Sequence, residues 1–385
     1  MIYFDSAATT LQKPPRVAFA VLDAMRRCAS VGRGGYPAAA AAAETVFDCR
    51  SLAAELFGAT EEQVVFTMNA THGLNIAIET LVPEGGSVVI SGFEHNAVTR
   101  PLYARNARVT VAGTRLFSQE DTLSAFDDAL RQKPHAAVCT QVSNVFGYIL
   151  PLTQIAALCR QYAVPLIIDA SQGAGMLPLS LKQTGARFIA MPGHKGLYGP
   201  QGTGILLCAD GGQPLLFGGT GSNSARQAMP DFLPDRLEAG THNVCGIAGL
   251  AEGLRFVRAK TPQAILRHEQ RLLRQVTAEL RELPQLHLYT GENQSGVLSF
   301  TVENTDCEEA AALLGKHGAA VRAGLHCAPL AHESAGTKET GTVRASFSAF
   351  NTAQEAREFA RLCKKLFGSS EKAQFPTCYW SKNRI

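Results

Sequence analysis

Two stretches decide the fold of this chain: FIAMPGHKGLYGPQGTG, residues 188–204, and LIIDASQG, residues 166–173. In the first stretch an apolar, strand-like run leads into a glycine-rich turn that carries Lys195. In the second, another apolar run ends at Asp169, 26 residues before the lysine. Short apolar runs that end in polar groups are typical of buried parallel strands, whose carboxyl ends hold ligands. The two stretches therefore predict a crowded lysine and a buried carboxylate at one edge of a sheet.

A poised amine and a buried carboxylate are the pair that pyridoxal phosphate enzymes need. The lysine holds the aldehyde of the cofactor covalently, and the acid keeps the pyridine nitrogen protonated so that the ring accepts electrons. Each residue also has an ordinary alternative when it is taken alone. Lys195 would then be a surface lysine in a glycine-rich loop, and Asp169 would cap a helix.

The composition describes an ordinary globular protein of about two domains. The chain has 385 residues, of which 46% are hydrophobic and 18% are charged. The net charge of +3 is small, and no Lys/Arg block with interleaved aromatics occurs, so we expect no nucleic-acid partner. No apolar run is long enough to span a membrane, and Met1 leads directly into a strand-like IYF instead of a secretory signal. These features predict a cytoplasmic protein.

The ten cysteines include no C-x-x-C pair, so the sequence predicts no zinc or iron–sulfur site and no other metal. Without an export signal we expect reduced thiols, most of them small core residues. At most one or two of them are expected to be reactive.

Strand-like and helical stretches alternate between residues 64 and 208, which predicts a parallel, right-handed α/β sheet. The polar residues at or just beyond the predicted strand ends are expected to converge on one pocket. They are Thr71, His95, Asn144, Asp169, Gln172, His194 and Lys195.

The pattern predicts two domains. Residues 14–255 form the large domain with the mostly parallel sheet, and residues 256–368, together with an N-terminal arm of residues 1–13, form a smaller α+β domain. Residues 369–385 lack the hydrophobic periodicity of a helix or strand, which predicts a mobile tail.

Nine motifs in this order together resemble the class V aminotransferase-fold enzymes, and within them the cysteine desulfurase and selenocysteine lyase branch. The motifs are YFDSAATT, EHNAV, SNVFG, DASQG, GHKGLYGPQGTG, GGTGS, EAGTHN, RAGLHCAP and RASFSAFNT. The resemblance covers residues 3 to about 367. It implies pyridoxal 5'-phosphate as cofactor, the α/β fold of fold type I transferases, and a homodimer whose two active sites are shared between subunits.

The resemblance gives five residues a role near the cofactor ring. Lys195 is the lysine that carries the cofactor and removes the α-proton, and Asp169 is the partner of the pyridine nitrogen. His95 stacks on the ring and relays protons, Gln172 donates to the phenolic oxygen, and Asn144 lies near the ring and the substrate carboxylate. Outside these motifs His95 would be a structural histidine whose ring nitrogens are hydrogen-bonded, and Asn144 would form an Asx-turn.

Five further residues are implied at the phosphate. Ala70, Thr71 and His72 match the turn whose N–H groups bind a dianion, and His194 is a phosphate contact. Thr241 matches a threonine that reaches the same phosphate across the dimer. Its alternative is an ordinary loop hydroxyl.

This sequence departs from the family pattern at two places. Pro192 stands where relatives often carry a hydroxyl residue, so one phosphate contact is expected to be missing. Gly196 is an additional glycine after the lysine, which predicts a looser loop. The phosphate would then depend more on GGTGS, residues 218–222.

For the substrate carboxylate, the motif VRASFSAFNT implies Arg344, because a planar guanidinium grips a carboxylate bidentately. Its alternative is a strand arginine paired with a local acid. Arg322 is a second candidate, and Arg33 is expected at the entrance.

Cys327 occupies the position of the family's nucleophilic cysteine, next to His326 on a loop bounded by glycine and proline. A thiol that attacks sulfur must be reachable by the substrate, whereas most of the other cysteines are expected in the core. Only 17 positions separate Cys327 from Arg344, which resembles the desulfurases with a short loop.

The predicted function is a pyridoxal phosphate-dependent cysteine desulfurase that converts L-cysteine to L-alanine and leaves a persulfide on Cys327. Its partners are L-cysteine or L-selenocysteine, a second copy of the chain and a sulfur-acceptor protein. The alternatives are a selenocysteine lyase or another pyridoxal phosphate-dependent β-lyase or aminotransferase. A protein of another class, a sulfur carrier or scaffold without turnover, stays open as well.

Overall fold

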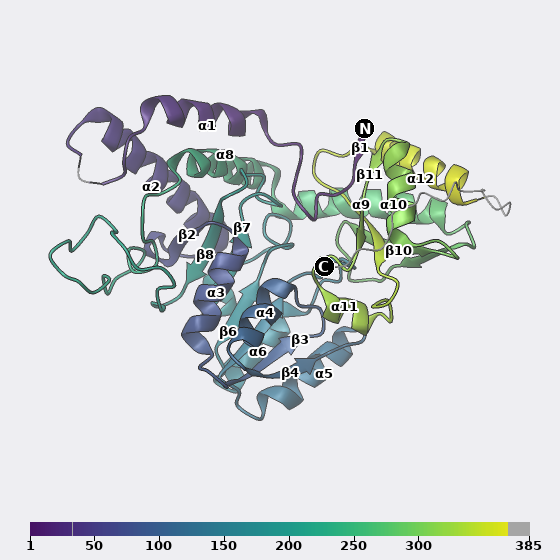
Figure 1. Ribbon diagram of the computed structural model, residues 1–385, viewed down its shortest axis with the longest axis horizontal. Coiled ribbons are helices and arrows are strands. Elements are labelled where there is room, and N and C mark those ends of the chain that lie inside the picture. Colours follow the sequence, from purple (N-terminus) through teal and green to yellow (C-terminus); the bar gives the residue numbers. More distant parts are fainter. Residues whose placement is uncertain (33, 369–385) are drawn as a thin grey trace, which may run out of the picture.

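The computed structural model describes residues 1–32 and 34–368 (Figure 1). Arg33 and the predicted tail, residues 369–385, lie outside the described residues. The centre of the large part is a seven-stranded sheet in which β8 is the antiparallel strand and the others run in parallel. In pairing order its strands are β2 (Val64–Thr67), β8 (Gly204–Cys208), β7 (Phe188–Pro192), β6 (Leu166–Asp169), β5 (Ala136–Thr140), β3 (Ser87–Ser91) and β4 (Arg108–Ala112).

Both faces of this sheet are buried under helices, as the unbroken apolar strands predict. Along β3, Val88 and Ile90 pack with α3 and α4 on one face, whereas Val89 packs with α2, α5, α6 and α8 on the other. The predicted α/β fold with a mostly parallel sheet is confirmed. The helices of this part are α1 (Pro15–Arg27), α2 (Pro37–Phe57), α3 (Ala70–Leu81), α4 (Asn96–Ala104), α5 (Gln119–Leu130), α6 (Leu152–Gln161), α7 (Leu181–Thr184) and α8 (Val244–Lys260), with the short 3-10 helix η1 (Glu61–Gln63).

Local sequence explains where the long helix α2 begins and ends. Pro37 stands at its first position, where the missing N–H costs no hydrogen bond, and alanine fills its first two turns. Gly58 then ends it in the left-handed conformation, with φ of 57°. The alanine-rich sequence and Gly58 therefore account for the extent of α2.

The C-terminal part contains a second, antiparallel sheet. It is covered by α9, α10 and α12, whose apolar faces pack on β10 and β13. Its strands in pairing order are β12 (Arg322–Gly324), β13 (Thr342–Ser346), β10 (Val297–Val302) and β9 (Leu286–Tyr289). The helices of this part are α9 (Pro262–Leu280), α10 (Cys307–Lys316), α11 (Pro329–Ser334) and α12 (Ala353–Phe367).

The N-terminal arm packs into the C-terminal core. Strand β1 (Ile2–Tyr3) pairs with β11 (Ala319–Ala320), and Figure 1 shows the arm crossing from there toward α1. The ring of Phe4 is fully buried, 4.8 Å from Phe347 and 5.2 Å from Phe359 between ring centroids. Burying a phenylalanine in this way stabilises the fold by about 1.5–3 kcal/mol.

The predicted domain boundary at residues 255/256 falls inside α8, which runs unbroken to Lys260. We propose that the large domain spans residues 14–260 and that the small domain begins after Thr261. This residue separates α8 from α9 and has a positive φ of 65°.

Strand register brings the carboxyl ends of β5, β6 and β7 together. Asp169 is paired with Thr140 on one side and with Ala190 on the other. The segments that follow these strands therefore lie side by side, as ligand sites of open α/β sheets require. No helix of the described residues is long and apolar enough to cross a membrane.

Candidate active site

A cavity of about 90 Å³ lies at the carboxyl ends of the strands. Eight of the residues predicted from the sequence line it, and they come from five separate segments of the chain. They are Ala70, Thr71, His95, Asn144, Asp169, Gln172, His194 and Lys195.

Lys195 lies in the turn after β7, where its carbonyl accepts a hydrogen bond from Tyr198 N at 2.9 Å. Burial, opposed by Asp169 and reinforced by Arg344, lowers the pKa of its amine to about 8. At that pKa a substantial fraction of the amine is neutral near pH 8, which a lysine needs in order to act as nucleophile or base.

The structure corrects the expectation that Gly196 loosens this turn. A Cβ atom on Gly196 would lie 2.3 Å from the carbonyl oxygen of Ala174, and one on Gly175 would lie 2.0 Å from Gly196 O. The extra glycine therefore allows two backbone segments to pack closely behind Lys195.

Asp169 is the last residue of β6 and is 2% exposed. Its Oδ1 accepts a hydrogen bond from Ser171 N at 2.9 Å. Beside it, Gln172 donates from Nε2 to Ala7 O at 3.0 Å, which ties the N-terminal arm to the cavity. The carboxylate is therefore held in one orientation on a rigid strand end.

His95 is the N-cap residue of α4. Its Nδ1 accepts a hydrogen bond from Ala97 N at 3.0 Å, so a neutral ring carries its proton on Nε2. Burial, helped by Lys195 and Arg344 and opposed by Asp169, lowers the pKa of His95 to about 4. The ring is therefore neutral at physiological pH.

The N-terminus of α3 forms one end of the cavity. The side chain of Asn69 caps this helix by accepting from His72 N at 2.9 Å, so the N–H of His72 is already used. The N–H groups of Ala70 and Thr71 donate to no protein group within residues 1–32 and 34–368. Such free N–H groups are suited to bind an anion.

His194 lines the same end, with Nδ1 3.1 Å from Thr9 Oγ1. Burial, together with the charges of Lys195 and Lys13, lowers the pKa of His194 to about 4. Pro192 also lines the cavity and offers no N–H there. A neutral His194 therefore contributes to this end as a hydrogen-bonding group, not as a cation.

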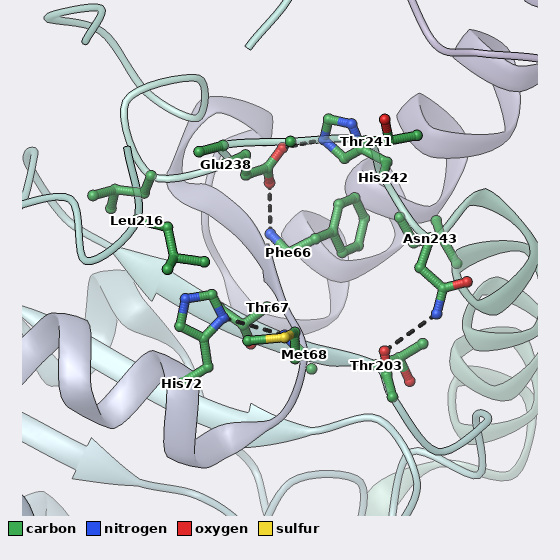
Figure 2. Close-up of a pocket in the computed structure, with 16 residues that line it drawn as sticks. Phe66, Thr67, Met68, His72, Thr203, Leu216, Glu238, Thr241, His242 and Asn243 are labelled. Atoms are coloured by element: carbon green, nitrogen blue, oxygen red, sulfur yellow. Dashed lines mark hydrogen bonds and ion pairs between the residues drawn. The ribbon is translucent and has the colours of Figure 1, made fainter. Parts of the chain in front are cut away.

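The side chains of His72 and Thr241 lie in a second cavity, of about 210 Å³ (Figure 2). On the loop that carries Thr241, the buried Glu238 accepts hydrogen bonds from Arg50 at 2.9 Å and from His242 Nε2 at 2.6 Å. Within one chain, Thr241 therefore does not line the cavity that holds Lys195.

Residues 218–222 form an exposed loop that also stays outside that cavity. The phosphate contacts predicted for His72, Thr241 and residues 218–222 remain predictions.

Arg344 on β13 is 2% exposed and lies behind the cavity. Its Nη1 donates to Asn144 O and its Nη2 to Asp5 Oδ1, both at 2.9 Å. Asp5 is thus the local acid that the sequence left open as an alternative. Arg322 is exposed and directly opposite Arg344 on the neighbouring strand, so the two guanidinium groups lie on one face of the sheet.

Cys327 is exposed and docked beside the cavity. Its carbonyl accepts a hydrogen bond from Asn96 N at 2.7 Å, directly after His95. The carbonyl of His326 accepts one from Asn144 Nδ2 at 2.8 Å. Two cavity segments therefore fix the backbone on which the thiol is carried.

Sequence reasoning missed several residues of the cavity. Thr140 is the last residue of β5 and Val142 follows this strand, and both line the cavity. Their position at strand ends was a usable signal. Glu94 is different, because burial raises the pKa of its fully buried carboxyl to about 8, and only the structure reveals that environment.

The match to a family model agrees with the geometry of this cavity. The chain belongs to the aminotransferase class-V family, whose model matches residues 2–359. Similar proteins include cysteine desulfurases. One, named a probable cysteine desulfurase, from Xylella fastidiosa, is 33% identical, and the alignment covers 96% of this chain and 92% of the relative. The cysteine desulfurase of Escherichia coli is 32% identical, with 92% of this chain and 90% of the relative covered.

A solved structure extends the likeness to the fold. The apo structure of a cysteine desulfurase from Thermococcus onnurineus superimposes with a TM-score of 0.88 at 29% sequence identity. The match covers 95% of this chain and 94% of that one. The overall fold is therefore similar over nearly the whole chain.

Proposed function

We propose that this chain is a pyridoxal phosphate-dependent cysteine desulfurase, which converts L-cysteine to L-alanine and takes the sulfur onto Cys327. One observation carries the proposal: Lys195, Asp169 and His95 line one cavity, and the exposed Cys327 is docked against two of its segments. The relatives described above favour sulfur over the selenocysteine alternative.

The residues present fit pyridoxal phosphate. The free N–H groups of Ala70 and Thr71 match a phosphate, and the fixed carboxylate of Asp169 matches a protonated ring nitrogen. The side chain of Lys195 donates no hydrogen bond to another described residue, so its amine is available for the aldehyde. When bound, the cofactor supplies an electron sink for the carbon next to the substrate amine.

The chain's own residues then have distinct tasks. The neutral amine of Lys195 accepts the α-proton, and Asn144 and Arg344 hold the substrate carboxylate. The Cys327 thiolate attacks the substrate sulfur: a sulfur–sulfur bond forms, the carbon–sulfur bond breaks, and the electron pair stays on the carbon. Protonation of that carbon completes alanine, so the reaction needs no external oxidant or reductant.

The two arginines explain how a carboxylate is attracted to the site. Arg344 is neutralised by Asp5, but its Nε–H is buried and lacks a partner among the described residues. Arg322 is exposed and directly opposite Arg344 in the strand register, so this part of the sheet keeps a net positive charge. A substrate carboxylate would satisfy the unpartnered N–H.

Replacing Arg344 with lysine is expected to lower kcat/KM for cysteine by about 10–100-fold, because a single ammonium cannot contact Asn144 O, Asp5 and the substrate carboxylate as the three nitrogens of the guanidinium can. Steady-state kinetics measure this, and the bound-cofactor spectrum should stay unchanged. Arg322→Lys is the matched control, with a smaller expected loss. If the ranking is reversed, the carboxylate site lies at Arg322.

Cofactor uptake by the cofactor-free protein is expected to depend on pH through Lys195, whose pKa is lowered to about 8. Only the neutral amine attacks the aldehyde, so the uptake rate should rise about tenfold per pH unit below pH 8 and level off above it. Absorbance measured between about pH 7 and 9.5 tests this, because the phosphate is already a dianion there. A rate that still climbs toward pH 10 would show an unshifted lysine.

We also propose a homodimer in which Thr241 contributes to the partner's phosphate site, and a sulfur-acceptor protein that takes the persulfide. Thr241→Ala should then weaken cofactor retention by about 1.5–3 kcal/mol, one hydrogen bond to a charged group. Equilibrium dialysis measures the change, with the exposed Thr153→Ala as control. Sedimentation that shows a fully active monomer would contradict the shared site. The cytoplasmic location also stays a prediction.

The purified protein incubated with L-cysteine, and separately with L-selenocysteine, tests the proposed function. We expect stoichiometric alanine and sulfide from cysteine in the presence of a reducing thiol. Alanine from selenocysteine alone would identify a selenocysteine lyase. No alanine from either substrate would contradict the proposal.

A further inference from the structure

The turn that carries Cys327 is in an unfavourable backbone conformation. His326 and Cys327 both have positive φ angles, 48° and 57°. Two consecutive non-glycine residues rarely adopt the left-handed region, because their Cβ atoms approach the backbone too closely. Such a turn persists only when its surroundings hold it.

Hydrogen bonds with three residues outside the turn hold it in place. Two go to its carbonyls, from Asn96 N to Cys327 and from Asn144 Nδ2 to His326, at 2.7 and 2.8 Å. The third joins His326 Nε2 to Thr342 O at 3.2 Å, with the ring nitrogen as donor. These contacts fix two backbone atoms and one edge of the His326 ring, but they leave its flat face to be supported by packing.

His332, on α11, supplies that support. Its side chain is fully buried, and its ring lies nearly parallel to the His326 ring, with centroids 5.8 Å apart and an interplanar angle of 28°. Phe146 lies 5.7 Å away, centroid to centroid. The orientation of His332 is fixed by Thr337, whose Oγ1 lies 2.8 Å from Nδ1.

Both imidazoles are neutral. Burial, together with the charge of Arg344, lowers the pKa of His326 to about 2, and burial lowers the pKa of His332 to about 4. Two neutral rings stack without charge repulsion. The pair is therefore a rigid packing element over the working pH range.

We propose that His332 is a positioning residue for Cys327. Its ring, oriented by Thr337, supports the flat face of His326 and so keeps the thiol-bearing turn at the mouth of the site. The proposal rests on the proposed function of Cys327 as sulfur acceptor. His332 does not line the cavity of Lys195, so it should affect sulfur transfer and not cofactor or substrate binding.

His332→Ala in the full-length holoenzyme is the first test. We expect kcat for alanine formation to fall about tenfold, because displacement of a reacting group by a fraction of an ångström is costly. KM for cysteine should stay within about twofold, and cofactor content should be unchanged.

A second readout is independent of turnover. A trifluoromethyl label on Cys327 should give one narrow ¹⁹F signal in the wild type and a broadened or split signal in His332→Ala. The Cys327→Ser protein, labelled in the same way, identifies which signal belongs to Cys327.

The double variant His332→Phe/Thr337→Val provides a rescue. It keeps a flat ring against His326 and replaces both members of the polar pair, so no buried group is left unpaired. We expect kcat to recover to within about threefold of wild type and the single ¹⁹F signal to return. Failure of the rescue would show that the flat ring is not what positions the turn.

The proposal is overturned if His332→Ala keeps both a wild-type kcat and a single ¹⁹F signal. If the alanine variant does not fold, Thr337→Ala tests the same contact, with an expected loss of about threefold in kcat and a broadened signal; no change in either would overturn it. If wild-type protein makes no alanine from cysteine, the proposed function fails while the ¹⁹F comparison still decides the role of His332.

Discussion

Replacing Lys195 with alanine is expected to abolish alanine formation from L-cysteine, with a loss of roughly 10⁴-fold or more. The loss is large because one amine has two tasks, as the covalent anchor of the cofactor and as the base that removes the α-proton. Burial keeps that amine partly neutral near pH 8. No other lysine lines the cavity among the described residues, so no second amine can take over either task.

The same variant should lose the colour of the covalently bound cofactor. In the wild type, borohydride should fix the cofactor to the peptide that contains Lys195. Lys182→Ala is the matched control, because Lys182 is exposed on α7 and remote from the cavity, and its activity should equal that of wild type. A colourless wild type that takes up no pyridoxal phosphate would refute the assignment.

Cys327→Ser is expected to retain the cofactor and to bind cysteine, yet to release alanine from it at least about 10²-fold more slowly. A serine hydroxyl is a poor nucleophile toward sulfur at neutral pH, whereas a thiolate is a strong one. Cys28→Ser, at a half-buried cysteine, should have no effect.

The same pair of variants separates sulfur from selenium chemistry. The carbon–selenium bond is weaker, so a selenocysteine lyase would keep most of its selenide release in Cys327→Ser. A cysteine desulfurase, which we expect here, would lose its turnover of cysteine in the same variant. Undiminished desulfuration by the variant would place the nucleophile on another residue.

The sheet and most of the cavity could be predicted from the sequence, because their signals are local. Asp169 and Lys195 each follow a short apolar run, and parallel strands bring such ends together whatever the helices between them. The helix that ends at Gly58 was predictable for the same reason.

Contacts between distant side chains could not be predicted. The pairing of Arg344 with Asp5 joins residues 339 positions apart, and that of Asn144 with His326 joins residues 182 apart. The tight packing of Gly196 against Ala174 likewise depends on a backbone approach that no local pattern reveals. Thr241 is limited in another way, since its predicted contact lies on a second subunit.

Mass spectrometry of the wild-type protein after brief incubation with L-cysteine tests the central claim most directly. We predict that one additional sulfur atom is found on the peptide that contains Cys327, in an amount matching the alanine released in a single turnover, and that a reducing thiol removes it. Alanine released without that adduct, or with the sulfur on the peptide of a different cysteine, would contradict the assignment of Cys327 as sulfur acceptor.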